Sequence, residues 1–249
     1  LPGNQNALIS QIAAANPKTV VVLESGTAVT MPWLEKVAGV LEAWFAGNKG
    51  ADAVANILFG DVNPSDKLPI TFPKAESDLP HPTIAIPPHK GEADLANQEG
   101  KATFSVHYDE GLKVGYKWYD AENKSVLFPF GYGLSYTTFA YSGLKIQPGA
   151  EPSVEFTVRN TGHRDGAEIA QVYVSMPQSA GEPPKRLVAF KKLWIPAGQS
   201  RDFKLTIDRK YLSIFDEAQS EWKLVPGNYT FKVGGSSNVL TLSETVNLQ

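Results

Sequence analysis

The chain has 249 residues with 42% hydrophobic and 20% charged side chains, the balance of a globular protein with one large or two medium-sized domains. Its net charge is −3, and neither residues 1–136 (10 Lys and Arg, 15 Asp and Glu) nor residues 137–249 (13 and 11) have the basic excess that nucleic-acid binding needs. The absence of cysteine excludes disulfides and thiolate catalysis, and no apolar run approaches the ~18 residues of a membrane span.

The beginning of the chain alternates between helical and strand patterns. Apolar residues at helical spacing predict helices over 4–16 and 50–60. Apolar runs over 19–25 and 37–45 predict strands that are buried on both faces, and 67–72 predicts a short final strand. Strands that alternate with helices are typical of a parallel α/β layer.

The periodic patterns end at Pro73. Residues 73–102 are rich in proline and charge. Because a loop of this length is uncommon inside a compact domain, we interpret it as a surface excursion or a contact arm. The segment KVGYKWYD (113–120) predicts one more strand.

A different pattern begins after Phe139. Short runs of alternating apolar and polar residues are separated by turn signals such as Asn160-Thr161-Gly162. This pattern is typical of a β-sandwich of immunoglobulin-like type, and it places the domain boundary near residue 137. The runs cover 153–162, 168–176, 186–196, 201–207, 227–235 and 238–246.

The joining segment LFPFGYGLSYTTF (127–139) is aromatic and fits neither a helical nor a strand period. Its glycines allow sharp turns, and its large rings can bury extensive area. We interpret the rings as packing between two domains, with a sugar-binding platform as the alternative. The residues assigned to this packing are Phe128, Phe130, Tyr132, Leu134, Tyr136 and Phe139.

Residues that carry catalytic or metal chemistry are few. The four histidines have none of the spacings of metal-binding motifs, so no metal site and no cofactor are predicted. Glu24 follows a predicted buried strand and Glu110 precedes an aromatic run, so each can act as an acid or a base. A lone carboxylate is more often an ion-pair partner, and glycoside hydrolysis needs two carboxyls that converge.

Several segments together resemble the C-terminal part of family 3 glycoside hydrolases. They are LPGNQNALISQIAAANPKTVVVLESGTAVTMPWL, VLEAWF, ILFGDVNPSDKLPITFP and FPFGYGLSYTTF, and the likeness runs to the end of the chain. The resemblance implies a multidomain α/β plus all-β protein, with an N-terminal barrel outside this chain. The chain would hold part of an α/β sandwich, a parallel sheet flanked by helices (1–72), then a long loop and aromatic junction (73–136), and a fibronectin type III-like β-sandwich (137–249).

The resemblance also implies that the catalytic groups lie elsewhere. In the family the nucleophile is an aspartate on the barrel, and the acid/base is a glutamate upstream of the Leu-Pro-Gly with which this chain starts. No residue here matches either motif, so no catalytic residue is assigned to this chain. The family's Pro-Gly-Gln-Glu-Gly-Gly is replaced by AGNKGA (46–51). Trp44, Asn48 and Lys49, together with loop 73–102, are expected to face the barrel.

The resemblance implies the function of a retaining exo-acting β-glucosidase that hydrolyses terminal non-reducing β-D-glucosyl residues. The chain would act on a β-glucoside or oligosaccharide together with a barrel-bearing N-terminal segment, either a separate chain or a cleaved portion. Alone, it would be inactive. Its start, without an initiator Met, fits a fragment, and the family implies a periplasmic or secreted location.

Two alternatives stay open. The first is a β-xylosidase or a broad-specificity β-glycosidase, because the residues that read the sugar lie mainly outside this chain. The second is a non-catalytic carbohydrate-binding or structural module, which exposed aromatic rings on the β-sandwich would support. Trp194 and Trp222 are the candidates, but both lie in strand-like runs, where we expect them to pack in the core.

Overall fold

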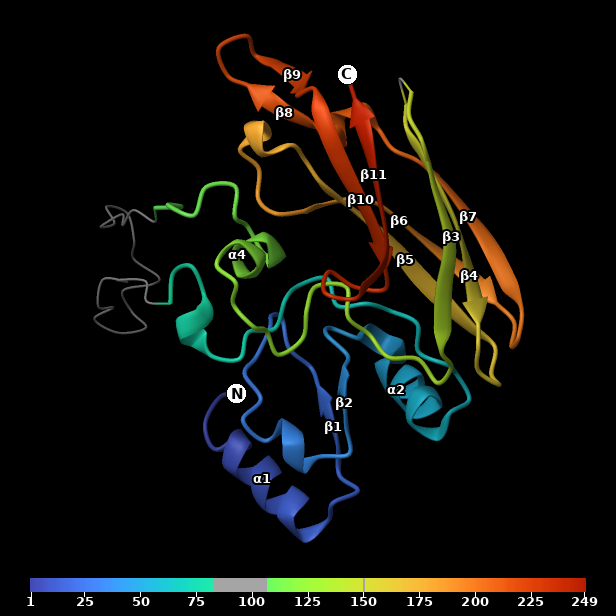
Figure 1. Ribbon diagram of the computed structural model, residues 1–249. Coiled ribbons are helices and arrows are strands. Elements are labelled where there is room, and N and C mark those ends of the chain that lie inside the picture. Colours follow the sequence, from blue (N-terminus) through green and yellow to red (C-terminus); the bar gives the residue numbers. More distant parts are fainter. Residues whose placement is uncertain (83–106, 150) are drawn as a thin grey trace.

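The computed structural model describes residues 1–82, 107–149 and 151–249, with an α/β layer at one end and a β-sandwich at the other (Figure 1). The N-terminus lies beside the α/β layer, and the C-terminus lies at the far end of the sandwich. This architecture confirms the predicted fold class. Within these ranges, no helix has the length and apolar character needed to cross a membrane.

The α/β layer is built on a small parallel sheet. Strand β1 (Val20–Leu23) pairs in parallel with β2 (Gly39–Glu42). Helix α1 (Gln5–Ala15) precedes β1, and α2 (Gly50–Phe59) follows β2. Gly60 ends α2 with a left-handed φ of 83°, which glycine adopts without steric cost. These elements confirm the predicted parallel layer.

Trp33 is the centre of the small core in this layer. Its side chain is fully buried, and its Nε1 donates a hydrogen bond to Asn6 Oδ1 of α1 at 2.8 Å. Leu23, Met31 and Phe72 are buried around it. The indole therefore buries a large apolar area without an unpaired donor, and it fixes α1 against the sheet.

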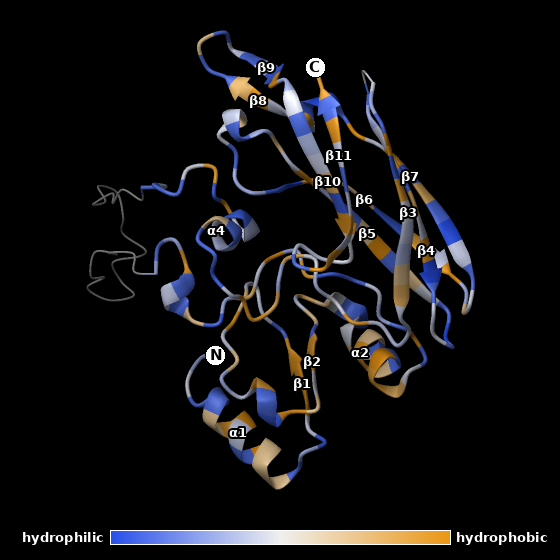
Figure 2. Cartoon of the chain, in the orientation of Figure 1, coloured by the Kyte–Doolittle hydropathy of each residue, from blue (hydrophilic) through white to orange (hydrophobic). Residues whose placement is uncertain are grey.

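The expectation that β1 and β2 are buried on both faces is wrong for this chain, because the residues of β2 are only partly buried and β1 is still more open. Val20 is 45% exposed and Val22 is 37% exposed, whereas Leu23 is buried. On α1, Leu8 and Ile12 are exposed as well. Figure 2 shows the apolar character of β1 along its length. A parallel strand becomes buried on both faces only where other elements cover both, and none of the described residues covers this side of β1.

The expected strand at 67–72 is also wrong. The backbone bends at Pro69 and Ile70, and within the described part of the chain the segment forms an isolated bridge between Phe72 and Phe128 in place of a strand. Leu68 N–H donates to Tyr132 O at 2.8 Å, and Phe72 N–H donates to Phe128 O at 2.9 Å. Pro69 lies between these bonds and has no N–H, so a regular ladder cannot continue. The segment instead joins the α/β layer to the aromatic junction.

Residues 113–120 contain a helix where we expected a strand. Helix α4 spans Tyr116–Ala121. Gly115 precedes it with a left-handed φ of 61°, and its carbonyl accepts a hydrogen bond from Trp118 N–H. The turn at Gly115 breaks an extended backbone. Tyr116 and Tyr119, three positions apart, then lie on one side of α4, as expected for a helix.

The β-sandwich consists of two antiparallel sheets. One has the strand order β11-β10-β5-β6, and the other has the order β3-β4-β7. A separate hairpin, β8–β9, stands at the far end (Figure 1). The bounds are β3 Phe139–Gln147, β4 Ser153–Asn160, β5 Gly166–Ser175, β6 Arg186–Ile195, β7 Ser200–Thr206, β8 Ser213–Asp216, β9 Glu221–Leu224, β10 Gly227–Gly234 and β11 Leu240–Leu248.

The sandwich core forms between the inner faces of the two sheets. Phe156 and Phe203 stack at 5.0 Å between ring centroids, and Val172, Tyr229 and Phe231 are fully buried nearby. The six predicted runs correspond to β4, β5, β6, β7, β10 and β11. Strands β3, β8 and β9 were not predicted from the sequence. The irregularity in β3 around a left-handed glycine breaks its alternation, and the other two strands are very short.

Candidate functional site

The carboxyl ends of β1 and β2 form the edge at which open α/β sheets place functional groups. Ser25 follows β1, and Glu42 ends β2. Ser25 Oγ lies 2.8 Å from Thr27 O and 3.2 Å from Glu42 Oε2. The other carboxylate oxygen of Glu42 accepts a hydrogen bond from Trp44 N–H at 3.0 Å. The Glu42 carboxylate therefore connects the loop after β1 with the loop after β2, and each of its oxygens has a hydrogen-bond partner.

Trp44 has a strained backbone at this edge. Its φ is 51°, a left-handed value that costs a residue with a side chain about 1–3 kcal/mol. The turn directs its ring inward, edge-on to Phe72 at 6.1 Å between centroids. The next ring, Phe45, is 86% exposed. It lies close to the backbone of Gly26, where an added Cβ would be only 3.1 Å from the ring. The loop therefore holds one aromatic ring inside the layer and presents the next one to solvent.

The other residues expected to face the barrel lie beside this edge. Asn48 and Lys49 are exposed, and Lys49 Nζ pairs with Asp52 Oδ2 at 2.9 Å. Glu24 is exposed directly after β1. Of loop 73–102, residues 83–102 lie outside the described part of the chain.

Glu110 belongs to a different environment from Glu24. Its Oε2 lies 2.6 Å from His81 Nε2, and this hydrogen bond lowers the pKa of the Glu110 carboxyl below its usual value. A carboxyl whose pKa is lowered by such a hydrogen bond is a poor proton donor. The described residues contain no group of three or more histidine or carboxylate side chains with the placement of a metal site.

A groove of about 710 Å³ begins next to the carboxyl edge. Its walls come from the loop after β1 (27–30), from residues between Pro69 and Pro80, and from the start of α4. Phe130 from the aromatic junction lines it, and Thr71 Oγ1 is buried there without a hydrogen-bond partner among the described residues. The size suits a small ligand or a peptide segment, and the walls are mostly apolar.

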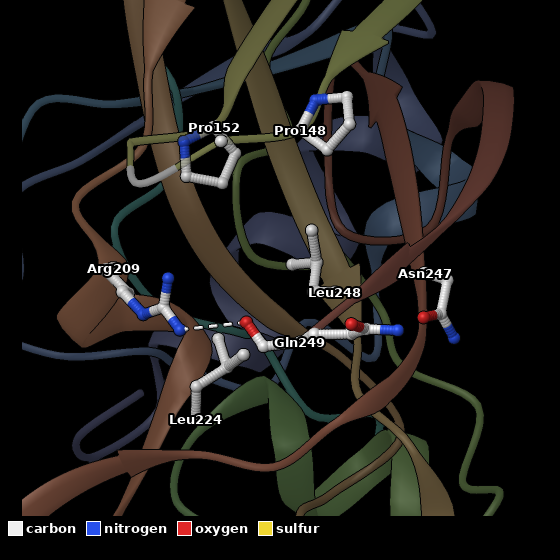
Figure 3. Close-up of a pocket in the computed structure, with 8 residues that line it drawn as sticks. Pro148, Pro152, Arg209, Leu224, Asn247, Leu248 and Gln249 are labelled. Carbon is white, nitrogen blue, oxygen red and sulfur yellow. Dashed lines mark hydrogen bonds between the residues drawn. The ribbon is translucent and has the colours of Figure 1, made fainter.

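A second pocket, of about 450 Å³, lies next to the C-terminus, at the end of the sandwich that is far from the α/β layer (Figure 3). Arg209 Nη2 donates to Gln249 O at 3.1 Å on one side of it, and Pro148 and Pro152 form another wall. Its described lining residues include no carboxylate side chain. It therefore offers no acid or base for hydrolysis.

The aromatic junction between the α/β layer and the sandwich contains two sets of packed rings. Phe128 stacks on Tyr132 at 5.1 Å between centroids, next to Phe72. Phe130 packs on Tyr116 at 5.1 Å, and Tyr116 is edge-on to Tyr173 of β5 at 5.7 Å. These contacts place aromatic rings between the two domains.

The end of the junction is less uniform. Phe139 begins β3 and packs against the sandwich core. The Tyr136 hydroxyl donates to Ile57 O at 2.7 Å, and the Arg164 guanidinium lies over its ring. Leu134 does not pack, because its side chain is 72% exposed, so assigning it to the interdomain contact is wrong.

Asn63 is a junction residue that the sequence alone did not reveal. Its Oδ1 accepts hydrogen bonds from Ser135 Oγ at 2.9 Å and Tyr136 N–H at 2.7 Å. Its Nδ2 donates to Asp165 O of the sandwich at 2.8 Å. The Asn-Pro step indicates a turn, but partners 72 to 102 residues away leave no local signal.

A buried polar network also crosses the junction. Glu168 of β5 is buried, and it accepts a hydrogen bond from the Tyr141 hydroxyl at 2.7 Å. Lys67 Nζ lies 3.4 Å from the other carboxylate oxygen and donates to Gly133 O. An ion pair in such a place is costly to break, because either charge alone would be buried without a partner.

We expect alkaline pH to destabilise the protein through its buried tyrosines. Burial raises the pKa of Tyr116 to about 12, and it also raises the pKa of Tyr141 and of Tyr173. The pKa of Tyr116 is 10.0 in the unfolded chain and about 12 in the folded one, so the unfolded chain loses its proton first as the pH rises. The stability from this difference is complete below pH 10.0 and is lost as the pH rises toward 12. Urea midpoints measured across this range should fall less steeply in Tyr116→Phe than in the wild type. The exposed Tyr211→Phe is the matched control, and an unchanged slope in Tyr116→Phe would contradict this explanation.

The chain matches two family models. One, described as the glycosyl hydrolase family 3 C-terminal domain, matches residues 1–136. The other, described as a fibronectin type III-like domain, matches residues 168–237.

Similar proteins are longer than this chain. Beta-glucosidase B of Emericella nidulans is 38% identical over 99% of the chain, which covers 29% of that protein. The crystal structure of DesR, a beta-glucosidase from Streptomyces venezuelae in complex with D-glucose, matches with a TM-score of 0.86 and 40% identity. The match covers all of this chain and 31% of DesR. A Bifidobacterium adolescentis family 3 beta-glucosidase matches with a TM-score of 0.87 and 36% identity, over 99% of this chain and 35% of that one.

Proposed function

Because the chain belongs to glycoside hydrolase family 3, we propose that it is the C-terminal part of a β-glucosidase whose catalytic barrel lies outside this chain. The observation that carries the proposal is the match along the whole chain to β-glucosidases of which it spans about a third. The substrate class is a β-glucoside or oligosaccharide with a terminal non-reducing β-D-glucosyl residue.

The proposed reaction is a double displacement with retention of configuration. An aspartate of the barrel attacks the anomeric carbon while a glutamate protonates the departing oxygen, and the same glutamate then activates water. Both carboxylates are assigned to the part of the enzyme outside this chain. One observation supports that assignment for the acid/base: the hydrogen bond between His81 and Glu110 lowers the pKa of the Glu110 carboxyl, which makes this carboxyl a poor proton donor.

The carboxyl edge of β1 and β2 is our proposed contact with the barrel. Phe45 is apolar and 86% exposed there, and exposing a large ring to water is unfavourable. The strained turn at Trp44 is what presents that ring, and such strain persists mainly at functional positions. Asn48 and Lys49 continue the same surface and supply polar groups at its rim. The chain would thus support one side of the active site without supplying its catalytic groups.

The complete enzyme tests this assignment of roles. We expect Glu24→Gln to keep kcat/KM for an aryl β-glucoside within about threefold of the wild type, whereas losing a general acid or base costs roughly a hundredfold or more. Glu110→Gln, at the carboxyl that is hydrogen-bonded to His81, is the second variant and should likewise keep kcat/KM within about threefold. A hundredfold loss in Glu24→Gln with unchanged folding would place a catalytic group in this chain and contradict the proposal. Comparison with an aryl β-xyloside decides between the glucosidase and the xylosidase alternative.

A further inference from the structure

Two aromatic rings stand exposed on strand β6. Phe190 is 66% exposed and Trp194 is 57% exposed, so the expectation that Trp194 packs in the core is wrong. In the register of the sheet, Phe190 lies opposite Gln171 of β5, and Trp194 lies opposite Ala167. Ala170, which is next to Gln171 in β5, points into the core. Side chains alternate along a strand, so both rings project from the outer face of the sheet. The sandwich core is complete without them.

The strand residue midway between the two aromatic residues forms an ion pair. Lys192 lies midway between Phe190 and Trp194 on the same face of β6. Its Nζ lies 2.8 Å from Asp66 Oδ1, in the loop after α2. The Asp66 side chain is 93% exposed and that of Lys192 is 45% exposed. The result is a strip with an aromatic ring at each end, about 13 Å apart along the strand, and charged hydrogen-bonding groups in the middle.

This combination fits a sugar chain better than a protein surface. A sugar ring has an apolar face, which can lie on an aromatic ring, and hydroxyl groups at its rim. The centres of protein–protein interfaces are depleted in Lys and Asp, and this strip has both at its centre. Exposed apolar groups that are rimmed by polar residues are typical of binding sites.

We propose that Phe190, Lys192, Trp194 and Asp66 form a surface site for a β-linked glucan chain. The two rings hold sugar faces, while the Lys192 ammonium donates to sugar hydroxyls and the Asp66 carboxylate accepts from them. The choice of a glucan as the ligand rests on the proposed β-glucosidase function. A site of this kind keeps an oligomeric or polymeric substrate close to the enzyme between rounds of hydrolysis.

Calorimetric titration of the 249-residue chain with cellohexaose tests the site directly. We expect saturable binding, and we expect Trp194→Ala and Phe190→Ala each to raise Kd about tenfold, the loss typical of a ring that carries binding energy. Trp222→Ala is the matched control and should leave Kd unchanged. Trp222, on the β8–β9 hairpin, is 48% exposed, so the expectation that it packs in the core is wrong as well. Its ring already has partners, because Lys210 lies over it and Phe215 is edge-on to it. No binding, or equal losses in Trp194→Ala and Trp222→Ala, would overturn the proposal.

A second measurement separates the glucan site from a protein interface. Trp194 should stay open to acrylamide quenching in the complete enzyme, measured as the difference between wild type and Trp194→Phe. If the complete enzyme shields Trp194, the strip is an interface between domains and the proposal fails. Because binding is measured without catalysis, its loss is distinguishable from a failure of the β-glucosidase assignment, which would appear as missing hydrolysis by the complete enzyme.

Discussion

Replacing Gly131 by alanine should destabilise the chain by about 2–5 kcal/mol. Gly131 has a left-handed φ of 79°, which any side chain makes unfavourable. A Cβ there would lie 2.2 Å from Gln171 Oε1, far inside van der Waals contact. The position lies at the centre of the aromatic junction, so the cost falls on the contact between the two domains.

Gln171 cannot simply move away from the new methyl group. Its side chain is buried, and its Nε2 donates to Gly131 O at 3.2 Å and to Gly235 O at 2.8 Å. Its Oε1 accepts a hydrogen bond from the Tyr173 hydroxyl at 2.6 Å. A shift of Gln171 would leave these groups buried and unpaired, which costs as much as the clash.

A second glycine separates the steric clash from the backbone strain. Gly198 has a φ of 72°, and a Cβ there would meet nothing within 4 Å. Gly198→Ala should therefore cost only the left-handed backbone term, about 1–2 kcal/mol. Urea unfolding of both variants, followed by tryptophan fluorescence, gives the difference. If both variants lose the same free energy of unfolding relative to the wild type, a clash with Gln171 does not contribute to the cost of Gly131→Ala.

Lys67→Met should also destabilise the chain strongly, by about 3–5 kcal/mol. The Lys67 and Glu168 side chains are 13% and 6% exposed, so the remaining carboxylate would be buried without a cation. Adding Glu168→Gln should restore much of the loss, because the amide oxygen still accepts from Tyr141 and no charge is left. The double variant should therefore be more stable than Lys67→Met alone.

The exposed pair of Lys49 with Asp52 provides the control for this cycle. Its side chains are 88% and 67% exposed, so Lys49→Met should change the unfolding free energy by no more than about 0.5 kcal/mol. If Lys67→Met costs no more than Lys49→Met, the buried pair does not hold the domains together. If the double variant is no more stable than Lys67→Met, an unpaired carboxylate is not the cause.

Periodicity predicted both layers because it reports which residues share a face. The alternation in the second half of the chain corresponds to strands, and the helical spacing at both ends of the α/β layer corresponds to α1 and α2. Periodicity does not say which face is buried. Trp194 and Ala170 lie on neighbouring strands but on opposite faces of one sheet, and only the packing of β3, β4 and β7 decides that Ala170 is inside.

Other features depended on distant parts of the chain. The short helix α4 follows one left-handed glycine and is held by Tyr116 against β5, so an aromatic strand-like pattern was misleading. The exposure of Val20 and Val22 depends on which elements flank β1. The role of Asn63 depends on partners in the junction and in the sandwich. Local propensity contains none of this information.

In the proposed function, this chain supports a catalytic barrel and does not itself hydrolyse glycosides. The sharpest experiment is aryl β-glucoside hydrolysis by the purified chain, by the N-terminal portion of the same enzyme, and by the two mixed. We predict no hydrolysis by the chain alone and recovered hydrolysis in the mixture, reduced by Phe45→Glu at the exposed carboxyl edge. Hydrolysis by the chain alone would place the catalytic carboxylates within it, and would contradict the proposed division of roles.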